Sequence, residues 1–165
     1  MTPLLVLVGP PGAGKSTVGQ LVALRRNVAF RDTDADVESV AGESIGEIFV
    51  DRGEQAFRVM EHDAVATALT EHDGVLALGG GAVLDPDTRA ALAGHHVVFL
   101  DVGLADATSR VGLNRDRPLL LGSPRAQLRT MLEQRRPLYL EVAKATVDTD
   151  GREPSEVADA VLAVL

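Results

Sequence analysis

The chain has 165 residues, of which 45% are hydrophobic and 24% charged, and its formal net charge is −8 at pH 7. This length predicts a single domain over residues 1–165, and the acidic charge argues against general binding to nucleic acid or to anionic membranes. The lack of cysteine excludes disulfides and thiolate metal sites. Because the sequence also has no signal-peptide pattern and no apolar run long enough to span a membrane, we expect a cytoplasmic protein.

Short apolar runs alternate with helix-compatible stretches along the chain. Strands are predicted at Leu4–Val8, Val28–Arg31, Val75–Leu78, Val97–Asp101 and Ala145–Asp148. Helices are predicted at Ser16–Arg25, Gly53–Thr70, Pro86–Leu92, Leu104–Val111, Pro124–Ala143 and Pro154–Leu165. Several of the runs are apolar throughout, as in parallel strands covered on both faces. The alternation therefore predicts an α/β fold with a doubly wound parallel sheet and ligands at the carboxyl ends of its strands.

Two stretches do not fit this alternation. Asp34–Arg58 is helical in composition but contains Gly42, Gly46 and Gly53, which we expect to interrupt it. Gly112–Pro124 is rich in arginine, leucine, glycine and proline. Insertions of this kind on an α/β core bind substrate or close over it.

The segment Gly9–Thr17 fits the phosphate-binding pattern G-x-x-x-x-G-K-[ST], between a predicted strand and a predicted helix. Backbone N–H groups around Gly12 and Gly14 would wrap a phosphate, since glycine has no side chain to obstruct them, and the helix N-terminus adds positive potential. Lys15 would reach the β- and γ-phosphates, and the Ser16 hydroxyl would bind Mg²⁺. A simple glycine turn requires neither the lysine nor the serine, so the pattern predicts a nucleotide phosphate site.

Asp32 and Asp34 follow the second predicted strand and, being two residues apart, share one face. Phosphoryl transfer needs one acid to hold Mg²⁺ and one to position or deprotonate the attacking hydroxyl. A helix N-cap at Asp34 is the structural alternative, although it explains only one of the two carboxylates. Asp101, at the end of another apolar run, is a second candidate for the metal, with a strand-end turn as its simpler interpretation.

Arginine occurs at positions suited to binding an anion. Arg58 and Glu61 lie three apart on a predicted helix, so Glu61 could hold the Arg58 guanidinium while it grips a carboxylate; a surface ion pair is the alternative. Arg135-Arg136-Pro137 lies in the long Pro124–Ala143 stretch, and we expect the proline to kink or break that helix and so to direct the arginines. A solvated basic turn is the alternative there.

Arg115 and Arg117 of the second insertion could enter a closed site and neutralise charge on the transferred phosphoryl group. Asn114–Arg117 also resembles the Asn-Lys-x-Asp with which GTPases read guanine, but arginine stands at the lysine and aspartate positions, which argues against that class. Gly79–Gly81 end the third predicted strand and would allow a ligand to approach the backbone closely.

Together these segments resemble the shikimate kinase family, which has a nucleoside-monophosphate-kinase-like fold. The resemblance extends over nearly the whole chain and rests on Gly9–Thr17, Asp32-Thr33-Asp34, Phe57-Arg58 with Glu61, Gly79–Gly81, Arg115–Leu119 and Arg135–Tyr139, in this order. It implies a three-layer αβα P-loop fold with a five-stranded parallel sheet. It also implies a helical substrate-binding insertion at about residues 34–60 and a mobile lid at about residues 112–124.

The activity that this resemblance implies is transfer of the ATP γ-phosphoryl group to the 3-hydroxyl of shikimate, in the pathway to chorismate and the aromatic amino acids. Mg²⁺ would be held through Ser16 and Asp32, and the implied catalytic residues are Asp34, Lys15 and Arg117. ATP would be bound by Gly12, Ala13, Gly14, Lys15, Ser16, Thr17, Arg110, Arg117 and Arg152, with Pro154 near the adenine. Shikimate would be bound by Asp34, Arg58, Gly79, Gly80, Gly81 and Arg136, the two arginines holding its carboxylate. The family further implies a monomer with no nucleic-acid or membrane partner.

Two other functions stay open at this point. A gluconate kinase of the same fold should lack the paired arginines in combination with the triple glycine and the Asp-x-Asp. A nucleotide-sensing module would need no base, and both the Asp32/Asp34 pair and the arginine set argue against it. The chain departs from the family at Arg25-Arg26-Asn27, where a leucine–glycine helix end is usual; Asn27 can take the left-handed conformation instead.

Overall fold

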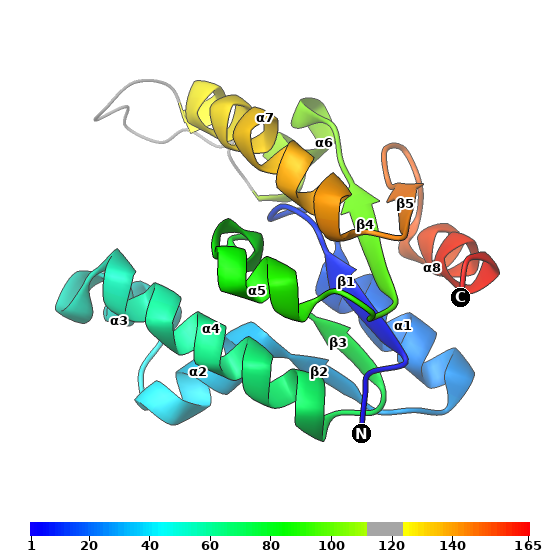
Figure 1. Cartoon of the computed structure of the whole chain (residues 1–165). Helices are drawn as coiled ribbons and strands as arrows, with labels where there is room; N and C mark the ends of the chain where they lie inside the picture. The colour runs from blue at the N-terminus through cyan, green and yellow to red at the C-terminus, as the bar shows by residue number, and fades with distance from the viewer. Residues whose placement is uncertain (112–123) are drawn as a thin grey trace.

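The computed structural model describes residues 1–111 and 124–165. Its elements in chain order are β1 (Leu5–Val8), α1 (Lys15–Arg26), β2 (Phe30–Asp32), α2 (Thr33–Ala41), α3 (Ile45–Arg52), α4 (Glu54–Glu71), β3 (Val75–Ala77), the 3₁₀ helix η1 (Ala82–Leu84), α5 (Pro86–Ala91), β4 (Val97–Asp101), α6 (Leu104–Arg110), α7 (Pro124–Val142), β5 (Ala145–Asp148) and α8 (Pro154–Ala163). Within these two ranges, five parallel strands form one sheet in the order β2-β3-β1-β4-β5. Helices cover both faces of the sheet (Figure 1), which confirms the α/β fold class.

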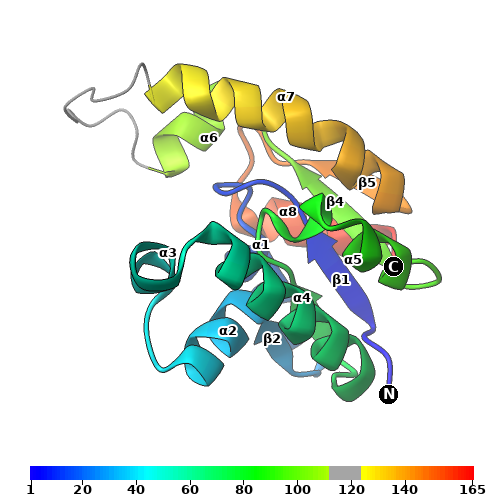
Figure 2. The same cartoon turned by 60° about the vertical axis from the view of Figure 1, so that its left-hand side comes forward.

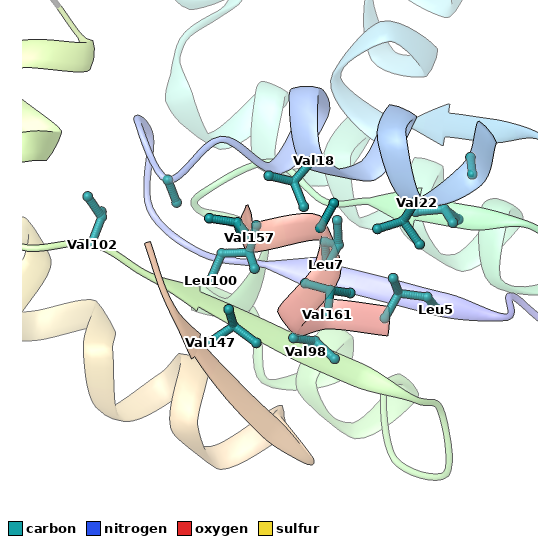
Figure 3. Packing of buried hydrophobic residues seen from close by; sticks show 14 of the residues in the cluster. Leu5, Leu7, Val18, Val22, Val98, Leu100, Val102, Val147, Val157 and Val161 are labelled. Carbon is teal, nitrogen blue, oxygen red and sulfur yellow. The ribbon is translucent and has the colours of Figure 1, made fainter. Parts of the chain in front are cut away.

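The sheet lies between two apolar layers because consecutive side chains of a strand point to opposite faces. Leu5 and Leu7 of β1 belong to a cluster with α1 and α8, whereas Val6 and Val8 belong to a second cluster with α4. The first cluster, seen from close by in Figure 3, contains Leu5, Leu7, Val18, Val22, Val98, Leu100, Val147, Val157 and Val161. Burial on both faces explains why the central strands are apolar without interruption.

The carboxyl edge of the sheet brings together the segments expected to bind ligands. β1 lies between β3 and β4, where the strand order reverses. The register aligns Asp32 of β2 with Ala77 of β3, and Ala77 with Leu7 of β1. The chain that follows these three strands therefore leaves the sheet at one edge and carries Asp34, the Gly79–Gly81 segment and the phosphate loop. In open α/β sheets, this reversal point is where ligands bind.

The first insertion forms a small layer of its own beside the sheet. Helices α2, α3 and the start of α4 lie together at one side of the molecule (Figures 1 and 2). They share an apolar cluster of Val37, Ile48 and Phe57. Gly42 and Gly53 end α2 and α3, as expected. The interruption expected at Gly46 is wrong, because Ser44 caps α3 through its side chain and Gly46 falls in the first turn of that helix.

The sequence predictions for the end of α1 and for Pro137 of α7 have different outcomes. Helix α1 ends at Asn27, whose left-handed φ of 54° confirms the expectation from the sequence. We expected Pro137 to kink or break its helix, and the break is wrong, since α7 runs continuously from Pro124 to Val142. Proline removes one backbone donor from a helix, but Leu128 before it and Tyr139 after it are both buried, so tertiary packing holds both parts of α7 in place.

Candidate active site

A cavity of about 500 Å³ lies over the phosphate loop at the carboxyl edge of the sheet. Its lining includes the predicted nucleotide-binding and acidic residues, together with Thr149, which was not predicted: Gly12, Ala13, Gly14, Lys15, Ser16, Thr17, Asp32, Asp34, Arg110, Thr149, Arg152 and Pro154. The residues that the sequence assigned to ATP and Mg²⁺ thus lie around one space, apart from Arg117, which is outside the described residues together with Arg115 and the rest of the predicted lid up to residue 123.

The phosphate loop has a backbone shaped to bind an anion. Gly12 and Gly14 adopt φ angles of 84° and 89°, which side-chain-bearing residues rarely take. Gly14 is the N-cap of α1 and supplies no side-chain cap, so the first-turn amides of α1 remain available to a ligand. This geometry is what a phosphate cradle requires.

Lys15 is held inside the same loop. Its Nζ donates to the carbonyl oxygens of Gly9 at 2.6 Å and of Pro10 at 3.0 Å. Burial lowers the pKa of Lys15 to about 8, although the nearby Asp34 and Asp32 carboxylates oppose this change. The ammonium group is therefore charged at neutral pH, and a bound phosphate would favour that charge further.

Asp32 links the phosphate loop to helix α2. Its Oδ2 accepts from the Ser16 hydroxyl at 2.9 Å, and its Oδ1 accepts from the Asp34 N–H at 2.9 Å. Asp32, and not Asp34, is therefore the N-cap of α2, which corrects the alternative raised from the sequence. The hydroxyl and the carboxylate are hard oxygen donors suited to Mg²⁺, which in phosphate sites takes few protein ligands and completes its shell with water and phosphate oxygens.

Asp34 lies in the first turn of α2 and lines the cavity. Burial raises the pKa of its carboxyl to about 6, the neighbouring Asp32 and Glu61 raise it further, and Lys15 opposes them. A carboxylate with a raised pKa is a stronger base than an ordinary aspartate, and such groups occur at catalytic sites. Asp34 can thus accept a proton from a hydroxyl held close to the phosphate loop.

Arg58 and Glu61 form a partly buried ion pair, and the surface alternative is excluded. Glu61 is only 4% exposed, and its Oε1 accepts from Arg58 Nη1 at 2.8 Å. Within the described part of the chain the buried Arg58 Nε has no hydrogen-bond partner, although Glu54 Oε2 lies 3.5 Å away. Burial raises the pKa of Glu61, while Arg58 and Arg135 oppose this change. A guanidinium fixed by a buried carboxylate and retaining a donor suits an anionic ligand.

The glycine segment leaves room for these side chains. A Cβ atom on Gly79 would lie 2.5 Å from Asp34 Oδ1 and 2.9 Å from Glu61 Oε2, and one on Gly81 would collide with the Arg58 guanidinium. The absence of side chains here therefore allows Asp34 and Arg58 to approach the same segment from two sides.

Arg136 does not lie where the resemblance placed it. Its Nη2 donates to Asp101 Oδ2 at 2.7 Å and its side chain is 52% exposed. It lines a separate hollow with Asp101. This contact also occupies the Asp101 carboxylate, which was the alternative candidate for the metal.

Arg135 takes the position expected for Arg136. It interacts electrostatically with Lys15, with Glu61 and with the Tyr139 hydroxyl. Consecutive helix residues point about 100° apart, so the continuous helix α7 directs only one of the two arginines to the site. The expectation that Arg136 lies at the site is therefore wrong: Arg136 pairs with Asp101, and Arg135 is the arginine that α7 directs toward Lys15 and Glu61.

Arg110 lines the cavity and contacts the phosphate loop. Its Nη1 donates to the Gly12 carbonyl at 3.0 Å and to Thr149 Oγ1 at 3.0 Å, and its Nη2 donates to the Thr149 carbonyl at 2.9 Å. Arg152 and Pro154 line the same cavity. The structure thus brings the three residues assigned to the adenine next to the phosphate loop.

Four polar residues of the site were missed from the sequence, one of them Thr149, which lines the cavity. Arg135 was passed over in favour of its neighbour, Thr33 lies between the two aspartates, and Tyr139 was noted only as part of a motif. Tyr139 follows Arg135 by four residues, so a continuous helix would place both on one face. Thr33 gave no signal, since its partner, the Gly79 N–H at 3.2 Å, is distant in sequence.

Within residues 1–111 and 124–165, no group of three or more His, Cys, Asp or Glu side chains is arranged to enclose a metal ion. No helix in these ranges combines the length and the apolar character needed to cross a bilayer.

Comparison with known proteins identifies the family. A family model described as shikimate kinase matches residues 11–165. The chain belongs to the shikimate kinase family. It is 61% identical to a shikimate kinase of Streptomyces avermitilis over 99% of this chain and 95% of the relative, and 58% identical to one of Frankia casuarinae over 98% of this chain and 72% of that protein. Among solved structures, it is similar to a shikimate kinase from Acinetobacter baumannii in complex with shikimate, with a TM-score of 0.89 and 34% identity over 98% of this chain and 91% of that chain.

Proposed function

We infer that this member of the shikimate kinase family transfers the γ-phosphoryl group of ATP to the 3-hydroxyl of shikimate, giving shikimate 3-phosphate and ADP. The observation that carries this conclusion is the convergence of three kinds of group on one place. Lys15 of the phosphate loop interacts with the Asp34 carboxylate and with Arg135, and Arg135 and Arg58 both interact with the buried Glu61. A phosphate site, a base and two cations suit transfer to a hydroxyl of a small carboxylic acid.

ATP is proposed to bind along the cavity with its phosphates on the loop. The amides of residues 12–17 and the Lys15 ammonium would hold the phosphates, while Arg110, Arg152 and Pro154 would contact the adenine. That all three line the same cavity as the phosphate loop supports this assignment. Arg117 of the predicted lid would contact the phosphates as well, although it lies outside the described residues.

Mg²⁺ is proposed to be held by Ser16 and Asp32, whose side-chain oxygens already lie 2.9 Å apart. When bound, the ion neutralises charge on the phosphates. Lys15 and the loop amides act on the same charge, and Asp32 at the same time fixes the start of α2 and hence the position of Asp34.

Shikimate is proposed to bind between Asp34 and the two arginines. Arg58 and Arg135 would hold its carboxylate, as planar guanidinium groups do, and Gly79–Gly81 would lie beside its ring. The buried Arg58 Nε that lacks a hydrogen-bond partner within the described residues supports an anion at this point. Arg136 is bound to Asp101 and does not belong to this proposed carboxylate site.

Asp34 is proposed to be the base. With a pKa of about 6, about nine in ten of its carboxyl groups are ionised at pH 7, so the group is charged and yet more basic than an exposed aspartate. The 3-hydroxyl oxygen forms the new bond to the γ-phosphorus, the bond from that phosphorus to the bridging oxygen of ADP breaks, and the hydroxyl proton passes to Asp34 Oδ.

The central experiment is ADP release with shikimate, quinate, gluconate or no acceptor, on the wild type and on Asp34→Asn. We expect turnover that depends on shikimate and is lost in the variant by a factor of about 10² or more. Gluconate-dependent turnover would favour the gluconate kinase alternative. ADP release that is equal without any acceptor would reject the transferase.

Arg135 and Arg136 carry the same charge one residue apart, so substituting each in turn tests which of them binds the acceptor carboxylate. Arg135→Ala should raise the KM for shikimate by a factor of about 10 or more, because a charged hydrogen bond is lost, and leave the KM for ATP nearly unchanged. Arg136→Ala, which removes an equal charge one residue away, should change neither KM by more than about twofold. Equal effects of both substitutions on shikimate would contradict the assignment.

We further infer a single-domain monomer that works in the cytoplasm. The lack of cysteine and the single continuous sheet support this inference. Light scattering coupled to gel filtration tests the oligomeric state. A mass of twice 17.4 kDa would contradict the monomer.

A further inference from the structure

Tyr139 lies at the junction of α7 and the glycine segment. The residue is 1% exposed, and its ring stacks on Phe99 of β4 with centroids 5.0 Å apart and planes inclined by 26°. It follows Arg135 by one turn of α7, on the other side of Pro137. The ring is thus fixed by the core, whereas its hydroxyl points to the site.

The hydroxyl interacts with two residues of the site. It donates to the Gly80 carbonyl at 2.6 Å, and the Arg135 guanidinium, one helical turn away on the same face of α7, interacts with it electrostatically. Burial raises the pKa of Tyr139 to about 12, with Arg135 and Arg58 opposing this change. The phenol therefore stays protonated at any working pH and keeps its bond to Gly80.

The glycine segment is also held at Gly79, its first residue. Thr33, which is fully buried, accepts from the Gly79 N–H through Oγ1 at 3.2 Å. Thr33 belongs to α2 next to Asp34, and Tyr139 belongs to α7 next to Arg135. Two buried hydroxyls thus join the segment to the helix carrying the base and to the helix carrying the second arginine.

We propose that Tyr139 is a positioning residue whose hydroxyl, anchored on the Gly80 carbonyl, holds the Arg135 guanidinium in place for the carboxylate of the acceptor. This proposal rests on the proposed function, because it takes Arg135 as a ligand of that carboxylate. An arginine side chain otherwise loses much rotamer freedom when it binds an anion, and a preformed contact reduces this loss.

Pro137 makes the anchor more important. It lies between Arg135 and Tyr139 and cannot donate to the carbonyl one turn before it, so the backbone of α7 is weakened at the turn that carries Arg135. The stacked ring and the bonded hydroxyl of Tyr139 hold the helix on the far side of this point.

The test is Tyr139→Phe, which keeps the ring and removes only the hydroxyl. We expect the KM for shikimate to rise roughly tenfold, because the bond to Gly80 and the interaction with the charged Arg135 are both lost, and the KM for ATP to stay within about twofold. In the Arg135→Ala background, adding Tyr139→Phe should change the KM for shikimate by less than about twofold, since the group to be positioned is gone. Fully additive effects, or an equal rise of both KM values, would overturn the proposal.

A matched control separates positioning from loss of stability. Thr88→Val removes another buried hydroxyl, which contacts His62 Nδ1 at 3.2 Å away from the glycine segment. This variant should lower the melting temperature without a change in the KM for shikimate. If it raised that KM as much as Tyr139→Phe, the effect at position 139 would be one of stability, and the proposal would fail.

A second measurement requires no mutation of Tyr139. Tyr139 is the one tyrosine of the chain, so incorporation of 3-fluorotyrosine gives a single fluorine resonance that reports this residue. We expect shikimate to shift the resonance in the wild type and not in Arg135→Ala. A resonance that ignores shikimate, or one that shifts equally without Arg135, would refute the coupling. Absence of shikimate-dependent ADP release in the unlabelled wild type would instead refute the proposed function.

Discussion

Removing the charge of Asp34 should stabilise the protein while abolishing its activity. The pKa of this carboxyl rises from an ordinary 3.8 to about 6 on folding, chiefly because of burial and then because of Asp32 and Glu61. The change of about two units corresponds to about 3 kcal/mol at 1.36 kcal/mol per unit. Because the residue is only partly buried, solvent screens part of this free energy, and we expect Asp34→Asn to gain about 1–2 kcal/mol at neutral pH.

The stability gain of Asp34→Asn should depend on pH. A group with a raised folded pKa binds its proton more tightly in the folded state, so folding is favoured by protonation. Below about pH 4 the carboxyl is protonated in both the folded and the unfolded chain and carries no penalty; as pH rises through about 6 the folded state loses this advantage. The stability gain of Asp34→Asn should therefore be close to zero near pH 4 and reach its full size above about pH 6.5.

Urea unfolding followed by circular dichroism, without nucleotide, acceptor or metal, measures the free energy at each pH. Asp36→Asn on the same helix is the matched control. It breaks the 2.7 Å ion pair with Arg31 and should destabilise the protein by up to about 1 kcal/mol. A lower stability of Asp34→Asn at neutral pH, or a gain of the same size at acid pH, would refute the reasoning that burial of this charge opposes folding.

Three further substitutions test separate parts of the site. Gly79→Ala places a Cβ atom 2.5 Å from Asp34 Oδ1 and should lower kcat by a factor of about 10², with nucleotide binding by calorimetry unchanged; a variant with wild-type kcat would show that this close contact is irrelevant. Arg110→Ala loses the bonds to the Gly12 and Thr149 carbonyls and should raise the KM for ATP about tenfold, while an unchanged KM would remove Arg110 from the nucleotide site. Asp32→Asn should shift the Mg²⁺ titration of activity upward by about tenfold at a nearly constant melting temperature, because asparagine caps a helix as well as aspartate does; an unaltered titration would count against Asp32 as a metal ligand.

The sequence alone determined the features that depend on local pattern. Strands β4 and β5 have the predicted bounds because their apolar runs end sharply at Asp101 and Asp148. The phosphate loop needed no tertiary information, since its glycines, lysine and hydroxyl follow one another along the chain. The identity of Asp34 as the base candidate also followed from the order of residues after β2, although the capping role went to Asp32.

Only the tertiary structure decided which side chains meet. Two adjacent arginines are equivalent in sequence, and the choice of Arg135 over Arg136 depends on the phase of α7, which an expected break at Pro137 concealed. Likewise, the contacts of Tyr139 with Gly80 and of Thr33 with Gly79 join residues 59 and 46 positions apart. Such contacts arise from the way the helices pack on the sheet. The helical periodicity of a sequence predicts which residues are buried, but it does not predict which partner each buried polar group finds.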